Sequence, residues 1–219
     1  MGQTRSGIIH FVLLIAFAAA IVVAIDPFHP FSSPDPNFRG LNLFSFFTVQ
    51  SNLIAAATLL AEAWMLVTGR RPGPGFGMLR GAAVLYMLLT ALVYALLLQG
   101  VVDANSALAF NWKNFILHQL APLFVLVEWL LWPPALSVSS GRSLTWLIFP
   151  ILWLVYTLTR AALTGWYPYP FLNPSWAGGT KGVIIYVVCI TIGLVLMCLI
   201  LAWVSRERNR GNKAGPRYV

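Results

Sequence analysis

The stretch KGVIIYVVCITIGLVLMCLILAWV, residues 181–204, decides the fold of this protein, and its one charged residue is Lys181. A helix needs about 20 mostly apolar residues to cross the hydrocarbon core of a bilayer. The stretch lacks the alternation of polar and apolar residues that marks a strand of a membrane barrel. It therefore predicts a transmembrane α-helix.

Five further stretches of the same kind precede it, which predicts an all-α polytopic membrane protein with six transmembrane helices in one domain, residues 1–219. The chain has 59% hydrophobic and 9% charged residues, whereas soluble proteins have about 25% charged residues. This composition excludes a disordered chain, a fibrous repeat and a disulfide scaffold. The other expected spans are Ile8–Ile25, Phe44–Thr68, Met78–Gln99, Lys113–Trp132 and Leu144–Leu163.

Basic residues are unevenly shared between the two sides that six spans would create. The side with both termini holds Arg5, Arg70, Arg71, Arg80, Arg142, Arg206, Arg208, Arg210, Lys213 and Arg217. The other side holds Arg39, Lys113, Arg160 and Lys181. Because positive residues favour the cytoplasmic side, both termini are expected there. The basic tail is then an anchor that contacts anionic membrane lipids, and nucleic acid is not an expected partner.

The first span has a second interpretation as a cleaved signal peptide, since Arg5 precedes it and it contains small residues at Ala16, Ala18 and Ala20. Its apolar run is longer than that of a typical signal peptide, which favours a retained helix. Cys189 and Cys198 both fall inside the last span, where they are expected to act as packing residues.

The two long outer connections, residues 26–43 and 166–180, are rich in proline and aromatic residues. Aromatic rings with a polar edge favour the headgroup region, so one interpretation is an interfacial belt. The other is a lid over an outward-facing lipid cavity, in which Trp166 and Tyr169 contact the substrate.

Two spans carry polar residues at the same expected depth. Thr48 and Asn52 are four residues apart and share a helix face, as do Asn114 and His118. Hydrogen-bonding groups are costly in hydrocarbon, so these residues suggest a site in the outer leaflet if the two helices are neighbours.

The pair has the chemistry of an acyl-transfer site. A threonine hydroxyl becomes a nucleophile when a base takes its proton, and neutral imidazole is such a base. Asn52 or Gln50 would donate to the developing oxyanion, and Asn114 would fix the tautomer of the His118 ring. The structural alternative is that Thr48 bonds to its own backbone while the amides and His118 join helices.

Other polar residues of the spans have simpler explanations. Arg160, one turn beyond Tyr156, either extends to the interface or points inward to a carboxylate, from the substrate or from Asp103. Glu62 and Glu128 are expected to pair with cytoplasmic-side arginines. Motifs for a serine elbow, a zinc helix or a phosphate loop are absent, and His10, His29 and His118 lie in unrelated elements, so no metal or other cofactor is expected.

Three stretches resemble a known family, the androgen-induced and androgen-dependent membrane proteins that hydrolyse fatty acid esters of hydroxy fatty acids. Phe46-Phe47-Thr48 is similar to the family's lead into its nucleophilic threonine. Residues 114–128, from Asn114 through His118 to Glu128, resemble its histidine helix, and residues 164–172 resemble its Thr-Gly-aromatic-Tyr-Pro-Phe-Leu segment. The resemblance implies Thr48 as nucleophile and His118 as its partner in an intramembrane threonine hydrolase. The chain looks like a compact bacterial relative, in the cell membrane.

The resulting hypothesis is a lipid-ester hydrolase that acts through a Thr48 acyl-enzyme, with residues 50, 52, 114, 156, 160, 166 and 169 in supporting or substrate-binding roles. One alternative is a lipid-binding or transport protein without enzymatic activity that uses the same polar cavity. The other is a structural protein whose polar groups only join helices.

Overall fold

The computed structural model describes residues 5–27, 40–100, 111–133 and 138–214. Helices make up 88% of the structure, and no strand occurs among the described residues. Six helical segments in these ranges are long and apolar enough to cross a membrane. The all-helical, six-span prediction is therefore confirmed. The chain divides into two compact units, residues 1–135 and 136–219. The expectation of one domain remains a prediction.

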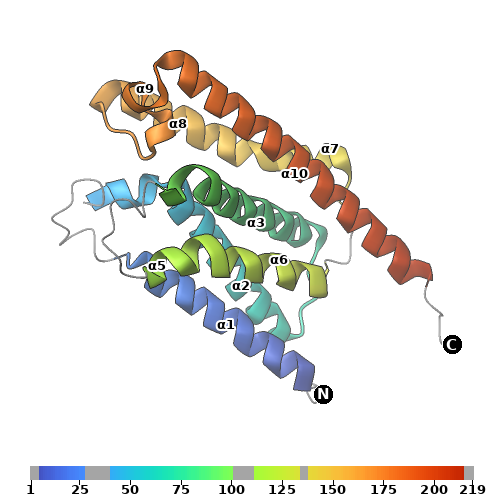
Figure 1. The fold of residues 1–219 in the computed structure, drawn as a ribbon. Helices are drawn as coiled ribbons and strands as arrows, with labels where there is room; N and C mark the ends of the chain where they lie inside the picture. Colours follow the sequence, from blue (N-terminus) through green and yellow to red (C-terminus); the bar gives the residue numbers. More distant parts are fainter. Residues whose placement is uncertain (1–4, 28–39, 101–110, 134–137, 215–219) are drawn as a thin grey trace. The chain divides into compact units, whose positions relative to one another are not determined.

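Unit 1 is a bundle of four spans (Figure 1). The first three are α1 (Arg5–Ile25), α2 (Phe47–Thr68) and α3 (Pro74–Val93), which continues into the wide π-helical turn η3 (Tyr94–Leu98). The fourth comprises α5 (Trp112–Phe115), the π-helical turn η4 (Ile116–Leu120) and α6 (Ala121–Leu131). Each span packs on the next, and the fourth packs back on the first, so that all four surround one core.

Small side chains let these helices approach closely. The buried alanines of the core come from all four spans and are Ala18, Ala24, Ala55, Ala56, Ala63, Ala82, Ala83 and Ala121. Lipid tails are as apolar as leucine, so membrane helices associate mainly through close van der Waals packing and hydrogen bonds between helices. The same bundle leaves Ile8, Ile9, Val12 and Val23 of α1 exposed, as a lipid-facing surface requires.

Unit 2 contains the last two spans and the aromatic connection between them. The fifth span consists of α7 (Ser140–Ser143), η5 (Leu144–Leu147) and α8 (Ile148–Thr164). The connection folds into two short turns, η6 (Pro170–Leu172) and α9 (Pro174–Ala177). The sixth span is α10 (Thr180–Ala214), and its exposed apolar residues include Ile184, Ile185, Val188, Ile192 and Ile200.

The second, third and fifth spans begin at other residues than expected. A 3₁₀ turn, η2 (Gly40–Ser45), precedes α2, and the extended backbone of Phe46 (φ −70°, ψ 132°) separates them, so α2 begins at Phe47. The third span was expected to begin at Met78, but α3 begins at Pro74, because proline suits a first helical turn whose N–H has no helical partner. Ser139 accepts a hydrogen bond from the Arg142 N–H, and this cap starts the fifth span at Ser140.

The sixth span also differs, since α10 continues ten residues past Val204, to Ala214. The basic segment after Trp203 is therefore helical at first instead of a separate tail. Of the outer connection 26–43, residues 28–39 lie outside the described residues. At the start of this connection, the Asp26 carboxylate pairs with the Lys113 ammonium of the fourth span at 2.9 Å.

Candidate functional site

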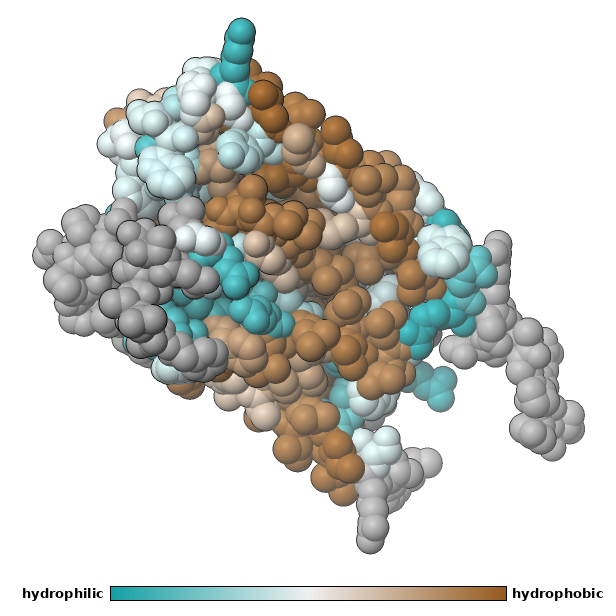
Figure 2. Space-filling view, in the orientation of Figure 1, coloured by the Kyte–Doolittle hydropathy of each residue, from teal (hydrophilic) through white to brown (hydrophobic). Residues whose placement is uncertain are grey.

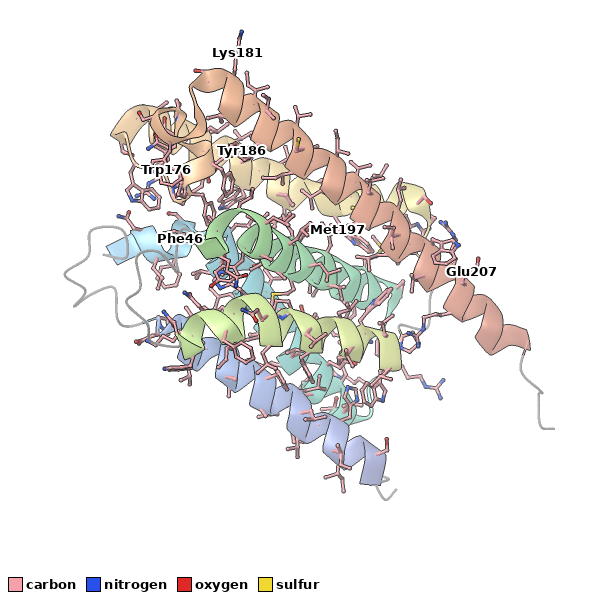
Figure 3. The ribbon with its side chains drawn as sticks, viewed as in Figure 1. Phe46, Trp176, Lys181, Tyr186, Met197 and Glu207 are labelled. Carbon is pink, nitrogen blue, oxygen red and sulfur yellow. The ribbon has the colours of Figure 1, made fainter. Side chains whose placement is uncertain are left out.

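The structure brings Thr48 and His118 together inside unit 1. Thr48 is the second residue of α2, His118 lies in the middle of η4, and the Thr48 Oγ1 is 3.3 Å from the His118 Nε2. Both side chains are half-buried. The corrected start of α2 places Thr48 in the first turn of its helix, closer to the helix end than predicted. Phe46, labelled in Figure 3, marks this end of α2.

The second nitrogen of the ring determines what His118 can do. The His118 Nδ1 lies 3.1 Å from the main-chain oxygen of Asn114. A carbonyl oxygen only accepts hydrogen bonds, so Nδ1 carries the hydrogen and Nε2 presents a lone pair to the Thr48 hydroxyl. The main chain of Asn114 thus fixes the tautomer that a general base requires, which is the role expected of this residue from the sequence.

The π-helical turn around His118 leaves one main-chain carbonyl, that of Leu117, without a main-chain donor. The Ala121 N–H donates to the Ile116 oxygen, five residues back, and is no longer paired with Leu117. The next residue, Pro122, has no N–H to offer. The Leu117 carbonyl therefore lacks both of the main-chain donors that a regular or a widened helix would supply.

Asn52 supplies the missing donor. Its Nδ2 donates to the Leu117 oxygen at 3.1 Å and also to the Thr48 oxygen at 2.9 Å, and its side chain is fully buried at 0% exposure. One amide therefore links the turn that carries the hydroxyl to the turn that carries the imidazole. Because both hydrogens of this amide are used, Asn52 fixes the distance between the two groups.

Gln50, the second amide expected to stabilise an oxyanion, has a similar arrangement. Its Nε2 donates to the Phe44 oxygen at 2.8 Å, which ties the first turn of α2 to η2. In this structure both amides thus donate to main-chain carbonyls around Thr48. These hydrogen bonds hold the helical turn that carries Thr48 in place.

Two contacts around the pair come from α3 and η3. The Thr90 Oγ1 hydrogen-bonds the Ser51 Oγ at 2.8 Å, and the Tyr94 ring stacks on the His118 ring with centroids 4.1 Å apart. Neither Thr90 nor Tyr94 was among the site residues predicted from the sequence. Their spacing of four residues, which puts them on one helix face, is the signal that could have identified them.

A second polar cluster lies further along the same four spans. The Arg80 guanidinium contacts Glu62 through Nε at 3.0 Å and Glu128 through Nη2 at 2.5 Å, and His10 Nε2 is 3.3 Å from Glu128 Oε1. All four side chains are buried. The expectation that Glu62 and Glu128 pair with arginine is confirmed, and the arginine is Arg80. That His10 joins them was not predicted from the sequence.

This cluster also contains the donor types of a metal site. The ligand atoms of His10, Glu62 and Glu128 lie within 4.8 Å of one another. Arg80, however, already contacts both carboxylates, and a divalent ion bound between them would lie against the charge of its guanidinium. The arginine is thus the cation that this arrangement accommodates.

The other predicted site residues, at positions 156, 160, 166 and 169, belong to unit 2. Tyr156 is 46% exposed on α8. The Arg160 guanidinium lies 4.3 Å from the centre of the Trp166 ring, and Tyr169 is buried and stacks on Phe171. Asp103, the protein carboxylate suggested for Arg160, lies outside the described residues. Within unit 2, Arg160 therefore contacts the aromatic connection, and Tyr169 is one of its buried residues.

The surface has the pattern of helices that cross a membrane. Hydrophilic residues gather near the end that carries α5 and again at the opposite end of the helices, whereas the sides of the helices are hydrophobic (Figure 2).

Comparisons of the chain with protein-family profiles, with curated proteins and with solved structures found no match.

Proposed function

We propose that the protein is an intramembrane hydrolase of lipid esters, with Thr48 as the nucleophile and His118 as the general base. One observation supports this most strongly: the hydroxyl of Thr48 lies 3.3 Å from the ring nitrogen that carries the lone pair. A nucleophile beside a base that a third group orients is the arrangement found in Ser-His-Asp hydrolases. The sequence likeness to the threonine hydrolases of fatty acid esters of hydroxy fatty acids supports the same assignment.

The proposed reaction has two halves. In the first, the Thr48 oxygen attacks the ester carbonyl while its proton passes to the His118 Nε2, and the imidazolium then protonates the departing alcohol, which leaves an acyl group on Thr48. In the second, His118 takes a proton from water, the hydroxide attacks the acyl carbonyl, and Thr48 recovers its proton as the fatty acid leaves. No cofactor takes part in either half.

The substrate class follows from the position of the pair. Thr48 and His118 lie in helices long and apolar enough to cross a membrane, so the substrate reaches them from the lipid phase. A long-chain acyl ester fits this route, and fatty acid esters of hydroxy fatty acids are the candidates that the sequence likeness favours.

We also propose the orientation of the protein. Ten basic residues on the side of the termini against four on the other side favour a cytoplasmic location for both termini. The likeness to the threonine hydrolases, of which the chain looks like a compact bacterial relative, favours a bacterial cell membrane. The Thr48–His118 pair then lies toward the outer face of the membrane, and the Arg80 cluster lies toward the inner face.

An activity-based probe tests the nucleophile directly. We expect a fluorophosphonate with a long alkyl chain to label the detergent-solubilised protein, with mass spectrometry locating the adduct on the peptide that contains Thr48. Thr48→Ala should remove the label. Thr58→Ala is the matched control, because Thr58 is a buried threonine of the same helix whose hydroxyl donates to the Ile54 oxygen at 2.7 Å.

Two results would contradict this proposal. Labelling that survives Thr48→Ala would place the nucleophile elsewhere. Binding of the ester without labelling and without turnover would favour the alternative, a lipid-binding or transport protein.

The role of Asn52 gives a second prediction. Asn52→Leu keeps the volume of the side chain but removes both hydrogen bonds, so the Leu117 carbonyl loses its donor and the His118 turn can shift relative to Thr48. We expect kcat to fall about 10²-fold, the scale of a small displacement of catalytic groups. The free energy of unfolding should also fall by about 1–3 kcal/mol, which is the cost of leaving a buried polar group without a hydrogen bond. Ester turnover and thermal unfolding measure the two effects, and an unchanged kcat would show that Asn52 does not position the pair.

A further inference from the structure

Tyr94 covers one face of the His118 ring. The two ring centroids are 4.1 Å apart and the planes are inclined by 23°. The Tyr94 side chain is only 7% exposed, so this contact is sheltered from solvent and lipid. The Thr48 hydroxyl approaches the same imidazole at Nε2, and the Asn114 carbonyl approaches it at Nδ1.

The stack is held in place from α2. One turn before Tyr94, the hydroxyl of Thr90 is hydrogen-bonded to Ser51 at 2.8 Å, and this buried contact fixes α3 against α2. The next residue of α2, Asn52, fixes the His118 turn through the Leu117 oxygen. Both rings are therefore positioned relative to one turn of the helix that also carries Thr48. A widened helical turn begins at Tyr94, where the Gln99 N–H donates to the Tyr94 oxygen.

We propose that Tyr94 is a positioning residue for the reaction of Thr48 and His118, an inference that rests on the function proposed above. The face of an aromatic ring is electron-rich and attracts a cation that lies over it. The imidazole is neutral before the reaction and becomes a cation when it takes the Thr48 proton. The Tyr94 ring thus favours the charged form of His118 and holds its plane toward the hydroxyl. This attraction grows as the transition state is approached, so it acts on kcat and leaves substrate binding largely unaltered.

Replacement of the ring separates this role from that of the tyrosine hydroxyl. In Tyr94→Leu we expect kcat for a long-chain fluorogenic ester to fall about 10-fold, the size of a sheltered cation–π contact, with KM changed less than about 2-fold. Tyr94→Phe keeps the ring face and should retain kcat within about 2-fold. If the leucine variant does not fold, Tyr94→Met removes the ring with a smaller change of volume.

Tyr86→Leu is the matched control. Tyr86 lies on α3, is 6% exposed and packs edge-on against Phe47, so its removal empties a similar volume without touching His118. We expect its thermal stability to fall as that of Tyr94→Leu does, while kcat stays within about 2-fold.

The outcomes distinguish this inference from the proposed function. Wild-type protein with no Thr48-dependent turnover would refute the proposed hydrolase. Wild-type turnover that Tyr94→Leu leaves unchanged would refute the role of Tyr94 alone. Equal losses in the phenylalanine and leucine variants would also overturn it, because the hydroxyl, and not the ring face, would then be responsible.

Discussion

Thr48→Ala should abolish hydrolysis of a long-chain ester, with kcat/KM at least about 10³-fold below that of the wild-type protein. Without the hydroxyl no acyl-enzyme forms, and the remaining site only binds the ester. His118→Ala should lose about 10²–10⁴-fold, since the hydroxyl would then have no base at 3.3 Å to take its proton. The measurement is steady-state turnover of a fluorogenic ester by protein reconstituted in lipid nanodiscs.

The paired substitutions make this result specific. Thr48 and His118 act as a unit in the proposed mechanism, so the losses of the two single variants should not multiply. The kcat/KM of the double variant should lie within a few-fold of that of the less active single variant. Thr48→Ser keeps an oxygen on the same carbon and should retain measurable turnover. Full activity in either alanine variant would remove that residue from the mechanism.

Arg80→Met should destabilise the protein by about 3–5 kcal/mol, the cost of breaking a buried ion pair and leaving its charges uncompensated. Arg80 contacts Glu62 at 3.0 Å and Glu128 at 2.5 Å, and without it two buried carboxylates would lie close together in the bundle. Thermal unfolding in detergent, followed by tryptophan fluorescence, measures the loss.

A compensated variant tests the electrostatic origin of this effect. Arg80→Met combined with Glu62→Gln and Glu128→Gln removes all the charges of these three residues, and it should recover most of the lost stability. Arg71→Met changes an exposed arginine in the connection after α2 and should shift stability by no more than about 0.5 kcal/mol. If the triple variant were as unstable as Arg80→Met, lost packing and not uncompensated charge would explain the result.

Local composition was sufficient to predict the six spans. Helical spans in a bilayer satisfy their backbone hydrogen bonds internally, so the length of an apolar run nearly determines where each one lies. The errors arose at the ends, where other local interactions decide. The extended Phe46 delays α2, Pro74 allows α3 to begin early, and the Ser139 cap begins the fifth span before its apolar run.

The candidate site was predictable only in part. Helix periodicity put Thr48 and Asn52 on one face, and Asn114 and His118 on another, but it could not say which helices are neighbours. The role of Asn52 depends on a carbonyl 65 residues away in the chain, which a widened turn and Pro122 leave without a main-chain donor. The contact between Tyr94 and His118 likewise joins two spans that no local pattern links.

The sequence alone therefore determined that this is a membrane protein of six helices, because the cost of exposing polar backbone to hydrocarbon acts on each segment separately. It also indicated which polar side chains are too costly to lie in a membrane without a partner. Only the tertiary structure shows which residues are those partners. The packing of four spans around one core brings Thr48 to His118 and His10, Glu62 and Glu128 around Arg80, because a hydrogen bond or an ion pair depends on distances between atoms that are remote in the chain.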